Sequence, residues 1–348
     1  MKVDRVLLAS PRGFCAGVEM AIKALAWMVR VFEPPVYCYH EIVHNKVVVE
    51  RFKELGVVFV DDITEVPAGA PLMLSAHGTA PQVVDGARQD GRTVVNAACP
   101  LVIKVHHEVK RRAAKGYSIV YVGHEGHQEA IGTMAVAPDA VHRVESVEEM
   151  MALPDSDQPV AFLAQTTLAV DEWKGLLEAA KGRWPDLWVP GHSDLCFATT
   201  NRQAALKAIA GQCDVVVVIG SDNSSNTNAL TRTAIAAGCP RAVRVNGADE
   251  LPDDLSGTVG VIAGASAPES LVVAVVEALN PAGGIDEVQA VDEDEYFPLP
   301  RELRDLLRTV AGAAAVAALA PGGDPLAGGG VVEDRDIPAA TAMATLSV

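Results

Sequence analysis

Short runs of apolar and β-branched residues alternate along this chain with longer segments of helical periodicity. The runs are nearly continuous, which is typical of strands covered on both faces, whereas half-exposed strands alternate apolar and polar residues. Strands are predicted at residues 3–9, 57–60, 71–76, 118–123, 160–164, 214–220 and 258–263. Helices are predicted at residues 18–32, 81–89, 101–115, 170–183, 199–212, 226–237 and 269–279. The alternation predicts an α/β fold with mostly parallel sheets.

Four of the predicted strands are followed by a loop of small and polar residues and then by a helix. The loops read Ser-Ala-His-Gly-Thr-Ala, Gly-His-Glu-Gly-His-Gln, Gly-Ser-Asp-Asn-Ser-Ser and Gly-Ala-Ser-Ala-Pro-Glu. Ligands of open α/β sheets bind beyond the carboxyl ends of the strands, where helix N-termini offer free N–H groups to anions. The pattern predicts three similar α/β units that share one central anion site.

The unit boundaries are predicted near residues 97 and 192. The first unit comprises residues 14–96, the second residues 97–192, and the third residues 193–281 together with residues 1–13. Residues 302–348 differ in composition, because they contain Gly-Gly-Asp-Pro, Gly-Gly-Gly and an alanine-rich run. Such a composition favours a disordered tail without a packed core of its own.

Three of the six cysteines stand close to Gly, Pro or a Thr/Asn cluster, at nearly even spacing along the chain: Cys15, Cys99 and Cys196. One thiolate from each of three units can hold a metal centre and leave one coordination position open. A protein iron–sulfur cluster usually takes four cysteines, so three would leave one iron free for a substrate. A single cysteine is more often a packing residue, and that interpretation fits the surroundings of the other three, Cys38, Cys213 and Cys239.

The charge balance restricts the possible partners. The 348 residues carry 28 basic and 45 acidic side chains, a net charge of −17, which argues against a general nucleic-acid or anionic-membrane binder. No run reaches the roughly 18 apolar residues of a membrane span, and the first apolar run is too short for a signal peptide. A cytoplasmic location with reduced cysteines is therefore expected, which favours thiolate–metal chemistry over disulfides.

Three histidines, His44, His77 and His127, stand beside Gly or Asn at predicted element ends. Imidazoles that converge on one site suit a phosphate group, although a lone histidine is more often structural. Hydroxyl groups add to this set at Thr166, Thr167, Ser224, Ser225 and Ser266. Their alternative role is helix N-capping, and both roles coexist where a phosphate docks at a cap.

Glu129 follows His127 by two positions. A carboxylate near an open metal position can carry protons as a general acid does. Its alternative role is that of a first-turn glutamate favoured by the helix dipole, and the sequence leaves both interpretations open.

The motifs, taken together, resemble those of the 4-hydroxy-3-methylbut-2-enyl diphosphate reductase family of the methylerythritol phosphate route to isoprenoids. The similarity covers roughly residues 5–280, and the matching segments occur in the family's order. They are Gly-Phe-Cys-Ala-Gly-Val, Glu-Ile-Val-His-Asn, Ser-Ala-His-Gly, Ala-Cys-Pro-Leu-Val, Gly-His-Glu-Gly-His-Gln-Glu, Gln-Thr-Thr-Leu, Cys-Phe-Ala-Thr-Thr-Asn-Arg-Gln, Asn-Ser-Ser-Asn and Gly-Ala-Ser-Ala-Pro-Glu.

The resemblance implies three α/β units around a pseudo-threefold centre. It implies that Cys15, Cys99 and Cys196 bind a 4Fe–4S cluster whose fourth iron takes the substrate's hydroxyl. The residues implied to hold the allylic diphosphate are His44, His77, His127, Ser224, Ser225, Asn226 and Ser266. Glu129 would relay protons, with Thr166 positioning the hydroxyl end and His127 beside them. Two electrons from ferredoxin or flavodoxin would give isopentenyl and dimethylallyl diphosphate.

The sequence departs from the family pattern at several places. Gln128 stands where the family often has a proline, and Phe197 where it often has a tyrosine. Ala229 lies where an arginine usually follows the Ser-Ser-Asn segment nearby, and Asp-Leu precedes Cys196 where Thr-Ile or a similar pair is typical. Two alternatives therefore remain at this stage. One is a non-catalytic iron–sulfur redox sensor descended from the enzyme, and the other is a closed zinc site of three cysteines and a histidine.

Overall fold

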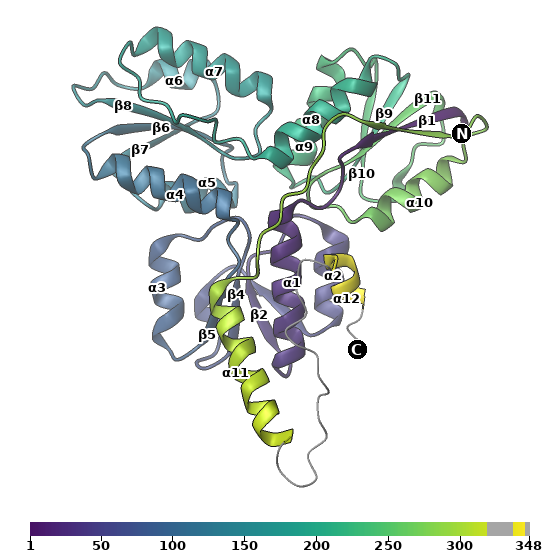
Figure 1. The fold of residues 1–348 in the computed structure, drawn as a ribbon. Helices are drawn as coiled ribbons and strands as arrows, with labels where there is room; N and C mark the ends of the chain where they lie inside the picture. Colours follow the sequence, from purple (N-terminus) through teal and green to yellow (C-terminus); the bar gives the residue numbers. More distant parts are fainter. Residues whose placement is uncertain (319–336, 345–348) are drawn as a thin grey trace.

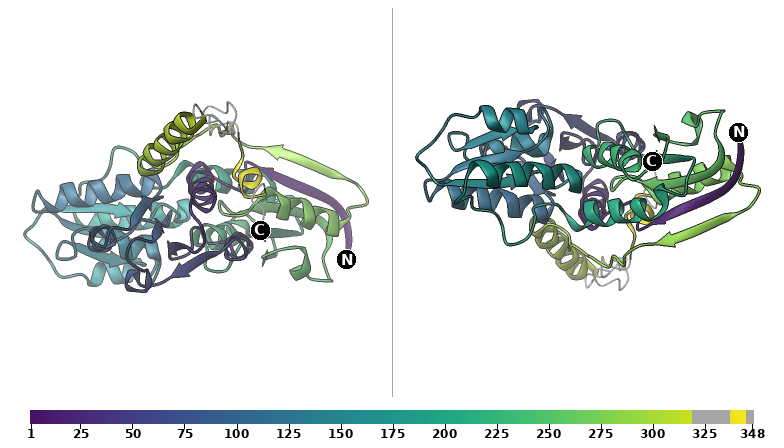
Figure 2. Two further views of the ribbon diagram at one scale, coloured as in Figure 1. Left: turned by 90° about the horizontal axis from the view of Figure 1, so that it is seen from below. Right: turned by 90° about the horizontal axis from the view of Figure 1, so that it is seen from above.

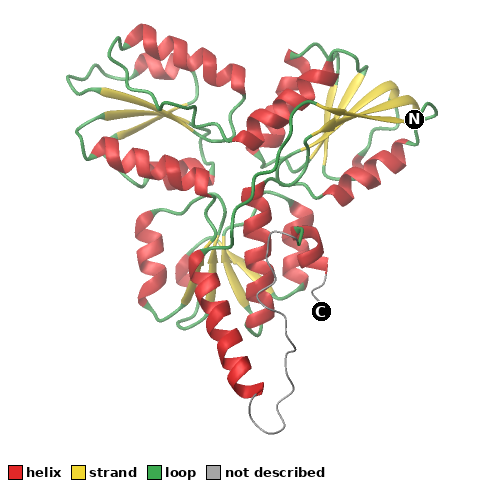
Figure 3. Ribbon diagram, viewed as in Figure 1, coloured by secondary structure: helices red, strands yellow, loops and turns green. Residues whose placement is uncertain are grey.

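The computed structural model describes residues 1–318 and 337–344 and consists of three lobes that meet at a centre (Figure 1). Each lobe has its own sheet, and every strand pair is parallel. Helices cover the sheets (Figure 3). The predicted α/β class with parallel sheets is therefore confirmed.

The first lobe contains a four-stranded sheet. Its strands in spatial order are β3 (Val57–Val60), β2 (Val36–Tyr39), β4 (Pro71–Leu74) and β5 (Thr93–Asn96). Its helices are α1 (Ala16–Val31), α2 (Lys46–Glu54) and α3 (Pro81–Gln89), with a 3₁₀ turn η1 (Ile63–Glu65). Met73 packs with α1 and α2, whereas its neighbours Leu72 and Leu74 pack with Ala87 of α3 on the other face. The alternation follows from the two-residue period of a strand.

The second lobe contains a three-stranded sheet. Its strands in spatial order are β7 (Val141–Val144), β6 (Ser118–Val122) and β8 (Val160–Ala164). Its helices are α4 (Pro100–Ala113), α5 (Gln128–Met134), α6 (Val147–Ala152) and α7 (Val170–Arg183). Ile119 and Tyr121 pack with α4 and α5, and Val120 and Val122 pack with α6 and α7. A strand that is buried on both faces has apolar residues at successive positions instead of alternating apolar and polar ones. The continuous apolar run in the sequence predicted this arrangement.

The third lobe contains a five-stranded sheet that includes the N-terminal strand. Its strands in spatial order are β10 (Ala242–Val245), β9 (Val215–Ile219), β11 (Ser256–Ala263), β1 (Lys2–Ser10) and β12 (Ile285–Gln289). Its helices are α8 (Phe197–Ala210), α9 (Ser225–Ala236) and α10 (Glu269–Leu279), with a 3₁₀ turn η2 (Ala248–Glu250). Figure 2 shows β12 beside β1 at the edge of this sheet.

The C-terminal segment corrects the sequence prediction. Helix α11 (Arg301–Ala318) begins after Leu299, and α12 (Ala339–Ala344) lies against α1. Leu299, Leu303 and Leu307 recur every four residues and are buried in the first lobe's core. The described residues 302–310 and 337–344 thus differ from the predicted disordered tail, because an apolar helical stripe provides burial that the glycine and alanine content concealed. Residues 319–336 and 345–348 of that prediction lie outside the described residues.

In the part of the chain that the structure describes, no helix is long and apolar enough to cross a membrane.

Candidate functional site

A central cavity lies where the three lobes meet. Its walls contain every residue that the sequence singled out for metal binding, substrate binding or catalysis: Cys15, Cys99, Cys196, His44, His77, His127, Glu129, Thr166, Ser224, Ser225, Asn226 and Ser266. The empty space between these walls, including the part open to solvent, is ≈ 770 Å³. A cavity of this size is typical of small-molecule sites.

The topology explains why residues so far apart in sequence converge. His44, His77, His127 and Ser224 lie in the loops that follow β2, β4, β6 and β9. Because parallel strands end at the same edge of a sheet, each lobe presents its loops on one side. The loop after β5, which contains Cys99, lies at the same edge of the first sheet.

Each of the three cysteines is the N-cap residue of a helix. Cys15 precedes α1, Cys99 precedes α4 and Cys196 precedes α8. The Sγ of Cys196 accepts a hydrogen bond from Thr199 N at 3.2 Å and lies 3.0 Å from Thr199 Oγ1. Unpaired N–H groups and the positive end of the helix dipole stabilise a thiolate at such a position.

Burial opposes ionisation of the three thiols in the absence of a metal. It raises the pKa of Cys196 to about 12, and it raises the pKa values of Cys15 and Cys99 as well. The charge of Cys15 raises the pKa values of the other two further. A bound metal centre reverses this balance, because a coordinating thiol is deprotonated outright.

Gly17 in the first turn of α1 leaves room for the thiols. A Cβ at this position would lie 2.7 Å from Cys99 Sγ and 3.9 Å from Cys15 Sγ. Only glycine lets the helix backbone approach the two cysteines so closely. The N-terminus of α1 and these two side chains therefore form a cradle from which other side chains are excluded.

The donor set fits a cluster better than a single ion. Among residues 1–318 and 337–344, no three His, Cys, Asp or Glu side chains are arranged to hold one metal ion. Zinc would need its sulfur ligands about 2.3 Å from one point, so the zinc alternative has no preformed site there. A multi-iron cluster is larger, its thiolates stand further apart, and its usual ligands are cysteines.

The three histidines form a contact group beside the cysteines. The rings of His44 and His77 stack with centroids 3.9 Å apart, and the ring of His127 lies edge-on to both, at 5.2 and 6.1 Å. Burial, followed by the charges of neighbouring histidines, lowers the pKa of His127 to about 3 and that of His77 well below its usual value. An anion in the cavity would offset this repulsion by favouring the protonated rings.

The N-terminus of α9 supplies polar atoms that have no partner among residues 1–318 and 337–344. These buried atoms are Ser225 Oγ and both amide atoms of Asn226. Ser224 caps the helix, with its Oγ accepting from Thr227 N at 3.3 Å. Buried polar groups are rarely left unpaired, and a helix N-terminus binds anions, so these atoms indicate a ligand.

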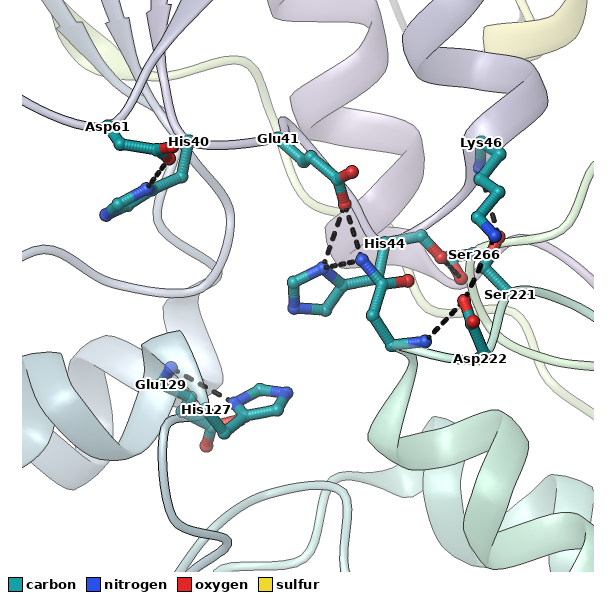
Figure 4. Close-up of polar contacts among 11 residues, drawn as sticks. His40, Glu41, His44, Lys46, Asp61, His127, Glu129, Ser221, Asp222 and Ser266 are labelled. Atoms are coloured by element: carbon teal, nitrogen blue, oxygen red, sulfur yellow. Dashed lines mark hydrogen bonds and ion pairs between the residues drawn. The ribbon is translucent and has the colours of Figure 1, made fainter.

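The imidazole of His44 is fixed by a residue that the sequence analysis did not single out. Glu41 Oε2 accepts from His44 Nδ1 at 3.2 Å (Figure 4). It also accepts from Asn223 Nδ2 at 2.8 Å. The bond with His44 is the largest cause that lowers the pKa of Glu41. Ser266 Oγ donates to His44 O at 2.8 Å, so the third lobe also fastens this loop.

The carboxyl group of Glu129 is buried in the second lobe. Its oxygens accept from Thr166 N at 2.8 Å and from Thr166 Oγ1 at 3.1 Å. Glu129 N donates to His127 Nδ1 at 3.1 Å, which leaves Nε2 to carry the proton of the neutral ring (Figure 4). Burial raises the pKa of Glu129 to about 7, with a smaller contribution from the charge of Asp194.

Three further residues at the site were not assigned roles from the sequence. Gln128 interacts with the ring of His77 and raises its pKa against the effect of burial. Gln128 Oε1 and His77 Nδ1 are both buried, and neither has another partner in the part of the chain that the structure describes. Phe197 and Phe297 close one wall, with ring centroids 6.1 Å apart. Phe297 lies beyond residue 280, where the motifs end, so no motif identified it.

Comparison with known proteins places this chain in a family. Residues 6–280 match the model of the LytB protein family. The chain belongs to the LytB family. The resemblance derived from the motifs is thereby confirmed, and the chain is an oxidoreductase.

Curated relatives with the name 4-hydroxy-3-methylbut-2-enyl diphosphate reductase align along most of their length. The protein of Corynebacterium diphtheriae is 45% identical over 307 residues, 86% of this chain and 92% of its own. The protein of Mycolicibacterium paratuberculosis is 46% identical over 308 residues, with the same coverage. The protein of Actinobacillus pleuropneumoniae is 43% identical over 307 residues, 86% of this chain and 98% of its own.

Solved structures of similar proteins have the same fold. The E-1-hydroxy-2-methyl-but-2-enyl-4-diphosphate reductase of Plasmodium falciparum superposes with a TM-score of 0.85 at 31% identity, over 89% of this chain and 99% of that one. A second structure, an (E)-4-hydroxy-3-methyl-but-2-enyl diphosphate reductase described as the terminal enzyme of the non-mevalonate pathway, has a TM-score of 0.58 at 30% identity. It covers 80% of this chain and 99% of its own.

Proposed function

We propose that this LytB-family protein reductively removes the hydroxyl group of 4-hydroxy-3-methylbut-2-enyl diphosphate. Cys15, Cys99 and Cys196 would hold a 4Fe–4S cluster. Two electrons and two protons would convert the C–O bond into a C–H bond and release water, giving isopentenyl or dimethylallyl diphosphate. One observation carries the proposal: three thiols at three helix N-termini share a cavity with three imidazoles and the unpaired polar atoms of α9.

The diphosphate group would be held by the three imidazoles and by the donors around the N-terminus of α9. His44, His77 and His127 would donate from their rings, and Ser224, Ser225, Asn226 and Ser266 would donate around the N-terminus of α9. The protein has a net charge of −17, so its overall electrostatic field repels anions. The diphosphate would therefore be held by directed hydrogen bonds from this local set of donors.

The hydroxyl end would lie beside Thr166 and Glu129. When bound, the cluster would supply electrons and an open iron that acts as a Lewis acid on the hydroxyl oxygen. Thr166 Oγ1 would orient that oxygen, and the protonated Glu129 carboxyl, with the His127 ring close by, would deliver a proton to the departing water. Because the anion clamp fixes the other end, the allyl group would be presented in one orientation.

Ferredoxin or flavodoxin is the proposed electron donor, and the cytoplasm the proposed location. Both follow from the resemblance and from a composition that suits neither nucleic acid nor membrane binding.

Anaerobically purified, cluster-reconstituted protein tests the proposal directly. With the hydroxylated diphosphate and a strong one-electron reductant, we expect both isoprenoid diphosphates to form and a Cys196→Ser variant to form neither. If the protein holds a full cluster and binds the diphosphate but forms no product, the proposed reductase activity is contradicted and the redox-sensor hypothesis is favoured.

A further inference from the structure

Arg202 is a fully buried cation on α8 whose guanidinium bonds to its own helix and to two separate segments. Nη2 donates to Gly13 O at 2.7 Å and to Phe14 O at 3.1 Å, and Nε donates to Gly13 O at 3.0 Å. Nη1 donates to Ala198 O at 3.1 Å and to both carboxylate oxygens of Glu293 at 3.1 Å. The planar, five-donor guanidinium suits such a junction, and a lysine could not reproduce it.

The segments joined by Arg202 carry two of the three cysteines. Gly13 and Phe14 directly precede Cys15, and Ala198 follows Cys196 by two residues. Ala198 and Arg202 both lie on α8, the helix that Cys196 caps. The bonds to Gly13 and Phe14 therefore attach the loop of Cys15 to the helix that begins after Cys196.

Glu293 is the counter-ion that satisfies this buried cation. Its side chain is 12% exposed, and its Oε2 also accepts from Asn201 Nδ2 at 2.9 Å. Glu293 lies in residues 290–300, the segment that runs from β12 to α11 past the centre of the molecule (Figure 1). Four residues later, Phe297 lines the central cavity. The Arg202–Glu293 pair thus attaches this segment to the site.

We infer that Arg202 and Glu293 are positioning residues that hold the Cys15 and Cys196 loops together and set the charge beside the metal centre. The inference rests on the proposed function, because it requires a cluster at these cysteines. Reduction adds negative charge to a cluster, and nearby charge and hydrogen bonds set its potential. Removing the carboxylate would therefore raise the midpoint potential, whereas removing the guanidinium would lower it.

The decisive experiment compares Glu293→Gln and Arg202→Gln with Glu295→Gln in the full-length, anaerobically purified protein. Glu295 is exposed in the same segment, so its substitution removes the same charge without touching Arg202. Three quantities are measured: iron and sulfide per chain, the half-life of the cluster in the presence of a chelator, and the midpoint potential in a spectroscopic redox titration. We expect both pair variants to lose the cluster several-fold faster, with potential shifts of opposite sign, and Glu295→Gln to match the wild type.

The outcomes separate the inference from the proposed function. If Glu293→Gln matches Glu295→Gln in half-life and potential, the positioning role is overturned. If Arg202→Gln does not fold, Arg202→Lys retains the charge without the planar fork, and we expect a potential close to wild type with faster cluster loss. A lysine variant as durable as the wild type would overturn the inference. Wild-type protein that takes up no cluster would overturn the proposed function itself.

Discussion

Glu129 accepts two hydrogen bonds from Thr166, one from the backbone N–H at 2.8 Å and one from the hydroxyl at 3.1 Å. The carbonyl oxygen of Thr166 accepts from Cys196 N at 3.0 Å. A continuous chain of hydrogen bonds therefore joins the buried carboxyl group to the N-cap of α8. The carboxyl group has little freedom to turn away from the cavity, which is the condition for efficient proton transfer.

Replacing Glu129 with Gln should reduce kcat while leaving the cluster bound. The amide preserves the shape and can still accept from Thr166, but it cannot give up a proton. Positioned general acids contribute roughly 10²–10⁴-fold to rate, so we expect a loss of that order with KM little changed. Steady-state kinetics with iron and sulfide analysis provide the measurement. Glu125→Gln is the matched control, since Glu125 is exposed in the preceding loop, and a fully active Glu129→Gln variant would exclude the proton-transfer role.

The rate should depend on pH through the same carboxyl group. Burial raises the pKa of Glu129 to about 7, so the group keeps its proton below that pH and loses it above. A proton donor is active in its protonated form, and kcat/KM reports the free enzyme. We therefore expect kcat/KM to fall as the pH rises through about 7.

The neighbouring Asp194 provides the control for this profile. Burial raises its pKa to about 7 as well, and its charge raises the pKa of Glu129. Asp194→Asn removes that charge, so we expect the falling limb to persist and to move to lower pH. If the limb disappeared in Asp194→Asn, the titrating group would be Asp194 rather than Glu129.

The sequence alone predicted the site residues because they occupy loops with unusual neighbours. Cysteine beside Gly or Pro, and histidine beside Gly or Asn, stand out from a chain of ordinary apolar runs. Glu41 did not stand out, because its contact with Asn223 exists only after the first and third lobes have come together. Arg202 lay inside a recognised motif, but its partner Glu293 lies outside every motif.

The fold was predictable where strands are long or wholly apolar. The seven strands predicted were found. Strands β5, β7 and β10 were missed because polar or charged residues interrupt their four-residue apolar pattern, and the four-residue β2 was missed as well. β12 reads Ile-Asp-Glu-Val-Gln and is mostly exposed, so it lacks the apolar run of a covered strand. β12 is positioned by its pairing with β1, a strand far away in the sequence. The local pattern of apolar and polar residues contains no information about such a pairing.

Gly17→Ala should impair cluster binding even though alanine favours helices. The new Cβ would lie 2.7 Å from Cys99 Sγ, so the thiol or the helix must shift. Gly175 in α7 has no atom within 4 Å of an added Cβ, and Gly175→Ala should stabilise the protein by about 0.5–1 kcal/mol. Iron and sulfide content after reconstitution tests the pair. Equal cluster content in the two variants would show that the close approach of α1 to Cys99 is not required.

Leu303→Ala should destabilise the first lobe, although Leu303 lies in the segment whose composition suggested disorder. The side chain is fully buried against the core that α1 also contributes to. Truncating a buried leucine costs about 2–5 kcal/mol, because it removes apolar contacts and leaves a cavity. Urea unfolding followed by circular dichroism gives the change in the free energy of unfolding. Val310→Ala in the same helix is the control, since Val310 is 41% exposed. Equal unfolding curves for the two variants would mean that α11 contributes nothing to the stability of the lobe on which it packs.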